Sequence, residues 1–258
     1  MLDSSVYVSS GVLMDRILYC LNNKQPLSVV SVGATETFVM AQYTVHSEEY
    51  FMNHPEAAVA NAGHKRGVKH RGVRFPNIEI RDAAVEAVKK ADIIGYCLSV
   101  HNMDAGKLTE IVFEKNNIKP LFVYDAYIRR VIMVSQKNKF EKMLSGRKIL
   151  LISTMAEEVK QQMEEGLQKR LGFTITGTIL IDQFEDIPRV KEEIAGCDFD
   201  LCLLAAGTNA LILAPYIAQT YGKVAFDLGQ GMASIVTGEI EIDIWMKKII
   251  GMDKLMNM

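Results

Sequence analysis

The amino-acid sequence predicts an α/β fold in which a Rossmann-like, mostly parallel sheet carries helices on both faces. Short apolar runs rich in β-branched residues alternate with amphipathic stretches of helical length along most of the chain. The run LSVVSV at residues 27–32 is typical of a strand that is buried on both faces, which favours parallel pairing. A chain of 258 residues, 49% of them hydrophobic, is also long enough to bury a core without disulfides or metals.

The predicted elements follow one another in a regular order. Gly33 ends the first strand and opens the next helix. The strands are expected at residues 27–32, 92–100, 121–124, 148–153, 174–181, 201–205 and 223–227. The helices are expected at residues 12–22, 35–45, 78–90, 105–115, 126–144, 156–171, 185–195 and 209–221. No linker rich in Pro, Gly or Ser divides the chain, so we expect one domain over residues 1–258, with two half-sheets meeting near residue 145.

Two segments depart from this alternation. Residues 47–75 are polar and show no clear period, which predicts a long irregular excursion of a kind that is often functional. Residues 237–258 form a predicted helical tail, amphipathic from residue 241 onward. Its expected apolar side consists of Ile242, Ile244, Trp245, Ile249 and Met252.

Composition and charge exclude several classes of protein. Lys and Arg number 29 against 31 Asp and Glu, and the resulting net charge of -2 disfavours a general nucleic-acid binder. The four cysteines form no CxxC pair, and so few cysteines in a chain of this length suggest a reducing compartment. The N-terminus also lacks a basic stretch followed by an apolar core, so we expect a cytoplasmic protein. The longest apolar region, residues 201–218, is interrupted by Gly207 and Pro215 and predicts a strand, a turn and a helix rather than a membrane span.

The ends of the predicted strands carry the candidate site residues, because ligands of open α/β sheets bind beyond the carboxyl ends of the strands. The turn Gly33-Ala34-Thr35-Glu36 opens a helix whose first N–H groups can hold a phosphate, although it matches neither GxGxxG nor a P-loop. In the small-residue turn at 205–209, Thr208 or Asn209 either caps the next helix or contacts a ligand.

Two aspartates also follow strands. Asp227 lies before Leu228-Gly229-Gln230-Gly231 and is suited to binding ribose hydroxyls or to orienting another side chain. Asp125 is a helix cap, a general base or a metal ligand, and its spacing favours the cap. The basic run HKRGVKHRGVR at residues 64–74 is either a solvated loop or a clamp for phosphate groups.

Taken in order, four segments resemble the GT-D fold glycosyltransferase family over roughly residues 12–236. They are PLSVVSVGATETFVMAQ, RFPNIEIRDAAVEAVKKADIIG, VYDAYIRRVIMVSQKNKFEKMLSGRKILLIS and FDLCLLAAGTNALILAPYIAQTYGKVAFDLGQ. The first is similar to that family's opening segment, in which an apolar strand enters a Gly-Asp-Gly-Glu-like turn. No single motif among them is specific, whereas the ordered set of four is.

The resemblance implies transfer of a sugar from a nucleotide-diphosphate sugar, with a UDP-linked donor expected. The acceptor would be a hydroxyl of a glycan, a peptide or a small molecule. Glu36 is implied to bind a divalent cation, Mn²⁺ or Mg²⁺, and Asp125 is the candidate base for an inverting displacement. The expected nucleotide-binding residues are Gly33, Thr35, Arg74, Arg81, Gly207, Thr208, Asn209 and Asp227.

The sequence departs from the family's Asp-x-Glu motif. Aligned on Gly33, the motif aspartate falls on Ala34, and only Glu36 is retained. Gln230 stands where similar sequences often carry histidine. Alanine cannot coordinate a cation, so one carboxylate together with the donor phosphates and waters would have to bind the metal. Otherwise the basic run would neutralise the phosphates, or catalysis would be lost.

Three alternatives stay open. The first is a non-catalytic nucleotide-sugar-binding or partner module with a degraded metal site, which Ala34 favours. The second is another Rossmann-type enzyme that uses a nicotinamide or a methyl donor, and the absence of GxGxxG after Val32 counts against it. The third is an interaction protein whose tail docks a partner or forms a homo-oligomer.

Overall fold

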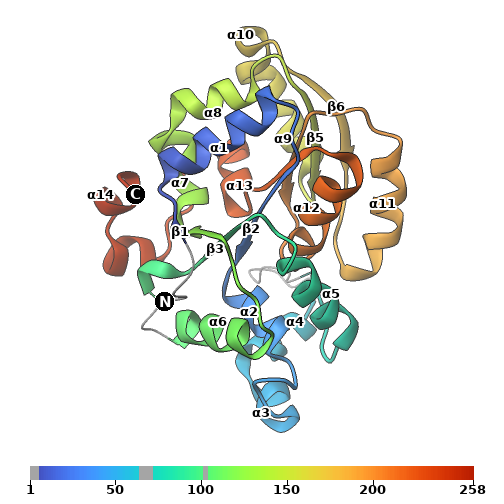
Figure 1. Ribbon diagram of the computed structural model, residues 1–258, viewed down its shortest axis with the longest axis vertical. Helices are drawn as coiled ribbons and strands as arrows, with labels where there is room; N and C mark the ends of the chain where they lie inside the picture. Colours follow the sequence, from blue (N-terminus) through green and yellow to red (C-terminus); the bar gives the residue numbers. More distant parts are fainter. Residues whose placement is uncertain (1–5, 64–71, 101–103) are drawn as a thin grey trace.

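All the strands belong to one parallel sheet, as the sequence predicts. The computed structural model describes residues 6–63, 72–100 and 104–258. The sheet has eight strands, and every neighbouring pair in it is parallel (Figure 1). From edge to edge they are β1 (Val6–Tyr7), β4 (Phe122–Asp125), β3 (Ile93–Tyr96), β2 (Leu27–Val32), β8 (Val224–Asp227), β7 (Leu201–Ala205), β5 (Lys148–Ser153) and β6 (Thr174–Ile179).

Helices cover both faces of the sheet and bury a hydrophobic core against each. The first core packs against α2 (Ala34–Ala41), α4 (Pro55–Asn61), α5 (Ile78–Val88), α6 (Asp104–Lys115), α11 (Ile187–Ala195) and α12 (Thr208–Tyr221). The second packs against α1 (Ser10–Asn22), α7 (Ile128–Ser135), α8 (Lys137–Leu144), α9 (Ala156–Met163) and α13 (Gln230–Thr237). Figure 1 shows α1, α7 and α8 together at the upper left and α11 at the far right. None of the described helices is long and apolar enough to cross a membrane.

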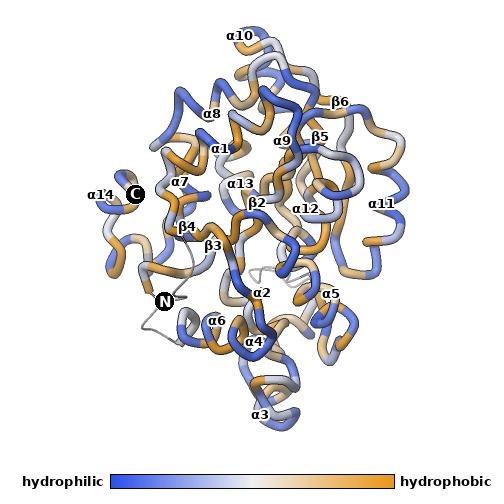
Figure 2. The backbone as a smooth tube through the Cα atoms, viewed as in Figure 1, coloured by the Kyte–Doolittle hydropathy of each residue, from blue (hydrophilic) through white to orange (hydrophobic). Residues whose placement is uncertain are grey.

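Alternation along each strand divides the side chains between the two cores. In β2, Val30 and Val32 belong to the first core and Val29 belongs to the second, as a period of two requires. All six residues of β2 are buried, which confirms that LSVVSV is a central strand. Figure 2 shows the hydrophobic residues concentrated in the middle of the molecule, where the strands lie.

The order of the strands reverses between β2 and β8. These strands are neighbours, yet α2 leaves β2 toward the first core and α13 leaves β8 toward the second. A crevice is therefore expected outside the carboxyl ends of β2 and β8, where ligands bind in open α/β sheets. The turns after Val32 and Asp227 both lie at this point.

The predicted irregular excursion at residues 47–75 contains two short helices, α3 (Glu48–Asn53) and α4. Side-chain caps start both, since Ser47 Oγ accepts from the Tyr50 N–H and His54 Nδ1 accepts from the Glu56 N–H. Helices of this length are too short to display an apolar period. The helix predicted at 126–144 is two helices, α7 and α8, which meet at Gln136. The short edge strand β1 and helix α13 were not predicted from the pattern.

Smaller elements complete the chain. They are η1 (Leu98–Val100), η2 (Glu164–Gln168), α10 (Lys169–Leu171), η3 (Phe184–Asp186), η4 (Trp245–Ile250) and α14 (Met252–Met256).

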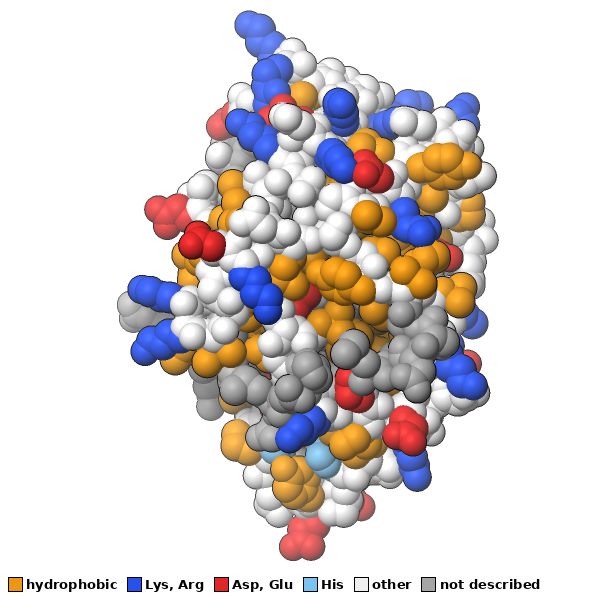
Figure 3. All heavy atoms as spheres, turned by 60° about the vertical axis from the view of Figure 1, so that its left-hand side comes forward, with side chains coloured by type: hydrophobic (Ala, Val, Ile, Leu, Met, Phe, Trp, Pro, Cys, Tyr) orange, Lys and Arg blue, Asp and Glu red, His pale blue; other side chains and the backbone are white. Residues whose placement is uncertain are grey.

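The C-terminal tail packs against α7, but mostly with a different face from the predicted one. Met246, Ile250 and Leu255 are buried there. Of the predicted apolar residues, Met252 packs against this core, whereas Ile242, Ile244 and Ile249 are at least half exposed. The reason is the π-helical turn η4, in which the Gly251 N–H donates to the Met246 carbonyl five residues back. A spacing of 3.6 residues per turn therefore assigns the wrong face. Figure 3, turned toward the side that carries the tail, shows hydrophobic side chains exposed across the middle of this face.

A row of three residues in register crosses the centre of the sheet. Ser31 of β2 pairs with Gly95 of β3, which pairs with Tyr124 of β4. The Tyr124 hydroxyl and Ser31 Oγ lie 2.5 Å apart and share a hydrogen bond across the strand between them. A Cβ atom on Gly95 would lie 2.4 Å from Tyr124 Cζ, so the glycine makes room for the buried ring.

We expect Gly95→Ala to lower the free energy of unfolding by about 1–3 kcal/mol, because an added methyl group overpacks the core. Gly166→Ala is the matched control, since a Cβ there meets no atom within 4 Å. The control should change stability by about 1 kcal/mol or less. Urea unfolding of both variants checks this, and equal stability of the two would contradict the account of the Ser31–Gly95–Tyr124 row.

Candidate functional site

The turn after β2 places Glu36 at the carboxyl edge of the sheet. Gly33 is the N-cap of α2, and its N–H donates to Glu36 Oε2 at 3.0 Å. Glu36 is only 9% exposed, so its carboxylate is held close to the start of its own helix. The Thr35 hydroxyl donates to Glu56 Oε1 of α4 at 2.8 Å, which ties the excursion to this edge.

Asp227 at the end of β8 is the centre of a buried polar cluster. Its Oδ2 atom accepts from the Ser31 N–H at 3.2 Å and from Arg129 Nη1 at 2.6 Å. The side chains of Asp227 and Arg129 are 3% and 14% exposed, so this is a buried ion pair. Glu36 interacts electrostatically with both partners. Gly33, Glu36 and Asp227, predicted separately, therefore lie in one region, and Arg129 of α7 completes it.

Sequence reasoning missed Arg129. Its position in the run YIRRVIMVS resembles that of a surface arginine on an amphipathic helix. The available signal is its place one turn after the strand-end Asp125, which brings the start of α7 to the same edge of the sheet. Its partner Asp227 is 98 positions away in the chain, so no local pattern pairs the two.

Burial and neighbouring charge act against each other at this ion pair. The pKa of Asp227 is raised to about 6. Burial is the largest cause and the charge of Glu36 adds to it, whereas Arg129 lowers the pKa. Burial would lower the pKa of Arg129, but the charge of Asp227 raises it above its ordinary value. The 2.6 Å contact favours the ionised pair, and at neutral pH both groups are therefore charged.

Two similar glycine turns follow the neighbouring strands β7 and β8. Gly207 has φ +53° and Gly229 has φ +48°, a conformation that side-chain-bearing residues rarely adopt. The turns start α12 and α13, which lie on opposite faces of the sheet. The two helix N-termini consequently meet at the edge where Asp227 lies, and both bring partial positive charge to it.

Buried polar atoms without partners surround these turns. Within residues 6–63, 72–100 and 104–258, Thr208 Oγ1, Asn209 Oδ1 and Gln230 Oε1 are buried without a hydrogen-bond partner. Thr208 and Asn209 are at most 1% exposed. Neither caps α12, whose N-cap is Gly207 and has no side-chain cap bond. Because an unsatisfied buried polar group is costly, these atoms are candidates for contact with a ligand.

Asp125 is buried and fully engaged by the backbone. Its Oδ2 accepts from the Ser99 N–H at 2.6 Å and its Oδ1 accepts from the Tyr127 N–H at 2.9 Å. Burial raises the pKa of Asp125 above its ordinary value, and hydrogen bonds from the Ser99 side chain and from the Tyr127 and Ser99 N–H groups oppose this rise. The contacts show Asp125 organising the chain before α7, and the role of a base stays a prediction.

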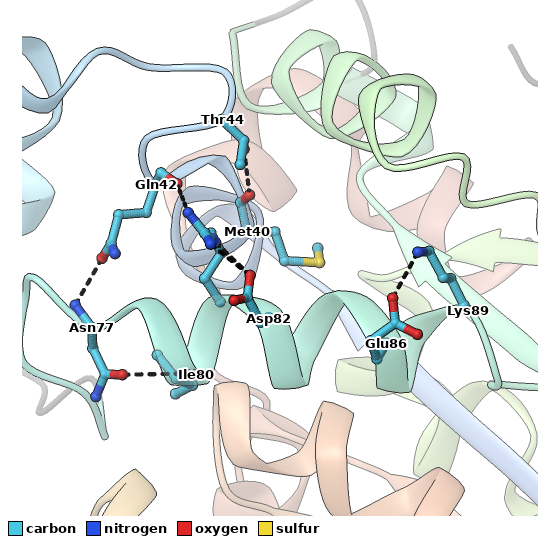
Figure 4. Close-up of polar contacts among 9 residues, drawn as sticks. Met40, Gln42, Thr44, Asn77, Ile80, Asp82, Glu86 and Lys89 are labelled. Atoms are coloured by element: carbon cyan, nitrogen blue, oxygen red, sulfur yellow. Dashed lines mark hydrogen bonds and ion pairs between the residues drawn. The ribbon is translucent and has the colours of Figure 1, made fainter.

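The two predicted arginines lie in other contacts. Arg81 of α5 donates to the Gln42 carbonyl at 3.2 Å and to Asp82 Oδ1 at 2.7 Å. Figure 4 shows Gln42, just past the end of α2, facing Asn77 at the start of α5, whose N–H donates to Gln42 Oε1. Arg74 is exposed, and residues 64–71 of the predicted basic run lie outside the described residues. The structure therefore gives Arg81 a contact that joins two helices.

The described carboxylates do not fit a resident divalent cation. Mg²⁺ takes about six oxygen ligands in near-octahedral geometry. Glu36 Oε2 accepts from Gly33, Asp227 Oδ2 is held by Arg129, and Ala34 adds no ligand. In the part of the chain that the structure describes, no group of three or more His, Cys, Asp or Glu residues could hold an ion. The requirement for Mn²⁺ or Mg²⁺ therefore stays a prediction.

Two open hollows lie away from this cluster. One of about 460 Å³ is lined by residues of α3 and α4, including Tyr50 and His54. The other, of about 450 Å³, lies at the opposite end of the strands beside Asp92 and Phe122. The second hollow includes one buried, unpartnered polar atom, Arg16 Nε, whereas the strand ends carry several, so the chemistry points to the cluster around Asp227.

The raised pKa of Asp227 predicts a pH dependence of stability. A carboxyl whose pKa is higher in the folded protein than in the unfolded chain binds its proton more tightly when the protein is folded. Its contribution to the free energy of unfolding therefore falls as the pH rises from the unfolded pKa through the folded pKa. A rise of the Asp227 pKa from 3.8 to about 6, at about 1.4 kcal/mol per pKa unit, corresponds to a change of up to about 3 kcal/mol in the free energy of unfolding. Urea unfolding from pH 4 to pH 7 should show wild type losing stability relative to Asp227→Asn, and a constant difference would contradict the assignment.

The comparisons with known proteins agree with this fold. The family model described as a GT-D fold-like domain matches residues 8–235. No curated protein and no solved structure is similar enough to this chain to match it. The match covers the sheet from just after β1 to α13 and includes every residue of the cluster around Asp227. The chain therefore belongs to the family of GT-D fold-like domains.

Proposed function

We propose that this protein binds a nucleotide-diphosphate sugar, expected to be UDP-linked, at the carboxyl ends of β2, β7 and β8. It transfers the sugar to an acceptor hydroxyl. The observation that carries this proposal is the set of buried, unpartnered polar atoms on Thr208, Asn209 and Gln230, beside two converging helix N-termini. Family membership supports the reaction class by analogy of fold.

In the proposed reaction, the bond between the sugar C1 and the diphosphate oxygen breaks, and its electron pair leaves with the diphosphate. The acceptor oxygen forms the new bond to C1 and loses its proton to a base, for which Asp125 is the candidate in an inverting route. Positive charge must stabilise the leaving diphosphate. At Gly207 no side chain lies between the backbone and the donor, so the donor can approach the backbone closely.

The second candidate function is a non-catalytic nucleotide-sugar-binding or partner module with a degraded metal site. Ala34 favours it, because the residue at the start of α2 carries no carboxylate and Glu36 is bonded to its own N-cap. Donor hydrolysis by Ala34→Asp separates the two functions. Hydrolysis that appears only in the variant indicates the degraded module, and hydrolysis already present in wild type indicates the enzyme.

Calorimetric titration with UDP, with GDP, ADP and NAD as controls, tests the binding site. We expect UDP to bind in preference to the others and Asn209→Ala to weaken its binding about 3- to 15-fold, the effect of one hydrogen bond. Asn138→Ala, at an exposed position on α8, is the matched control and should leave the affinity unchanged.

Two other results of the titration would change the conclusion. Preference for another nucleotide would change the donor class, and no nucleotide binding at all would contradict the proposed function and favour a scaffold or partner role. Unfolding temperatures of both variants show whether Asn209→Ala still folds. Cytoplasmic location and self-association stay predictions.

A further inference from the structure

We propose that Arg129 takes the place of a divalent cation at this site, so that its guanidinium pairs with the diphosphate of the donor and binding requires no metal. This inference rests on the proposed function, since it concerns how the same site holds a nucleotide diphosphate. It assigns a ligand-binding role to a residue that the strand-end motifs do not mark.

The charges at the site require a positive group. Glu36 and Asp227 are buried carboxylates at the site, and two negative charges oppose the binding of a diphosphate. A positive group must therefore lie among them, and the described residues do not assemble a cation-binding cluster. Arg129 contacts Asp227 directly and interacts electrostatically with Glu36.

Arg129 retains unused hydrogen-bonding capacity. Its Nη1 donates to Asp227, whereas its buried Nε has no partner among the described residues. Arginine presents five N–H donors in a fixed planar arrangement that matches phosphate oxygens. An ion pair on one edge of the guanidinium leaves the remaining donors to bind a phosphate, and a buried donor left unsatisfied would be costly.

The surrounding backbone lies very close to Arg129. A Cβ atom on Gly229 would lie 2.6 Å from Arg129 Cζ, and one on Gly231 would lie 2.4 Å from the Arg129 carbonyl oxygen. These two glycines let the start of α13 lie directly against the arginine. The guanidinium and a helix N-terminus are thereby placed together, and both attract an anion.

Arg130 provides a matched control on the same helix. It forms an ion pair of the same length, 2.6 Å, with Asp243, and its side chain is 16% exposed against 14% for Arg129. Arg130 binds the tail rather than the strand-end cluster, since its Nη1 also lies 3.4 Å from Met246 Sδ. Removing either arginine breaks an ion pair of the same length, although Asp243 is 33% exposed and Asp227 only 3%. Only the removal of Arg129 should affect nucleotide binding.

Calorimetric titration of the full chain with UDP, once in EDTA and once in MnCl₂, tests the inference. Wild type should bind with affinities that agree within about threefold in the two solutions. Arg129→Met should weaken binding about 10- to 100-fold in both, the effect of losing a charged hydrogen-bonding group. Arg129→Lys, which keeps the charge but not the planar donors, should lie between the two, and Arg130→Met should match wild type.

Two results would overturn the inference and leave the proposed function standing: UDP binding that EDTA abolishes and Mn²⁺ restores, or unchanged affinity in Arg129→Met. Failure of wild type to bind any nucleotide would instead contradict the proposed function and, with it, the inference. The comparison of EDTA with MnCl₂ uses wild type alone, so it decides the question even where Arg129→Met does not fold. The double variant Arg129→Met/Asp227→Asn, which also removes the carboxylate that Arg129 pairs with, provides a second test of the arginine.

Discussion

The buried ion pair between Arg129 and Asp227 joins the two halves of the sheet. Arg129 follows β4 on one side of β2, and Asp227 ends β8 on the other. Asp227 also accepts from the Ser31 N–H, and Ser31 reaches Tyr124 across Gly95. Polar contacts thus link β4 to β2, β2 to β8, and β8 to α7, the helix that follows β4 in the chain. A buried pair of this kind is strongly unfavourable when one partner is lost, so the contacts depend on one another.

The strand reversal at β2 and β8 explains why these groups gather at one point. Helices α2 and α13 leave the neighbouring strands toward opposite cores, which opens the edge between them. The turns at Gly207 and Gly229 adopt the same unusual backbone conformation and start two helices there. The polar cluster therefore occupies the place where an open α/β sheet binds its ligand.

Much of the fold could be predicted because its central strands are short, apolar and bounded by turn residues. The bounds predicted for residues 148–153 and 201–205 match β5 and β7. Helices α3 and α4 could not be predicted, since caps rather than an apolar period define them. The tail face was wrong because η4 is π-helical. At the site, Gly33, Glu36 and Asp227 were found from their positions after strands, whereas Arg129 depends on a pairing across the whole sheet.

We propose that a nucleotide diphosphate binds at the carboxyl ends of β2, β7 and β8 with its phosphates on Arg129. The absence of a carboxylate at Ala34 and the presence of a buried arginine beside Asp227 are then two parts of one arrangement of charge. A crystal structure of the protein with UDP tests this most directly. We expect the diphosphate to lie within hydrogen-bonding distance of the Arg129 guanidinium. A diphosphate bound through a metal on Glu36, or away from this edge of the sheet, would show that Arg129 does not hold it.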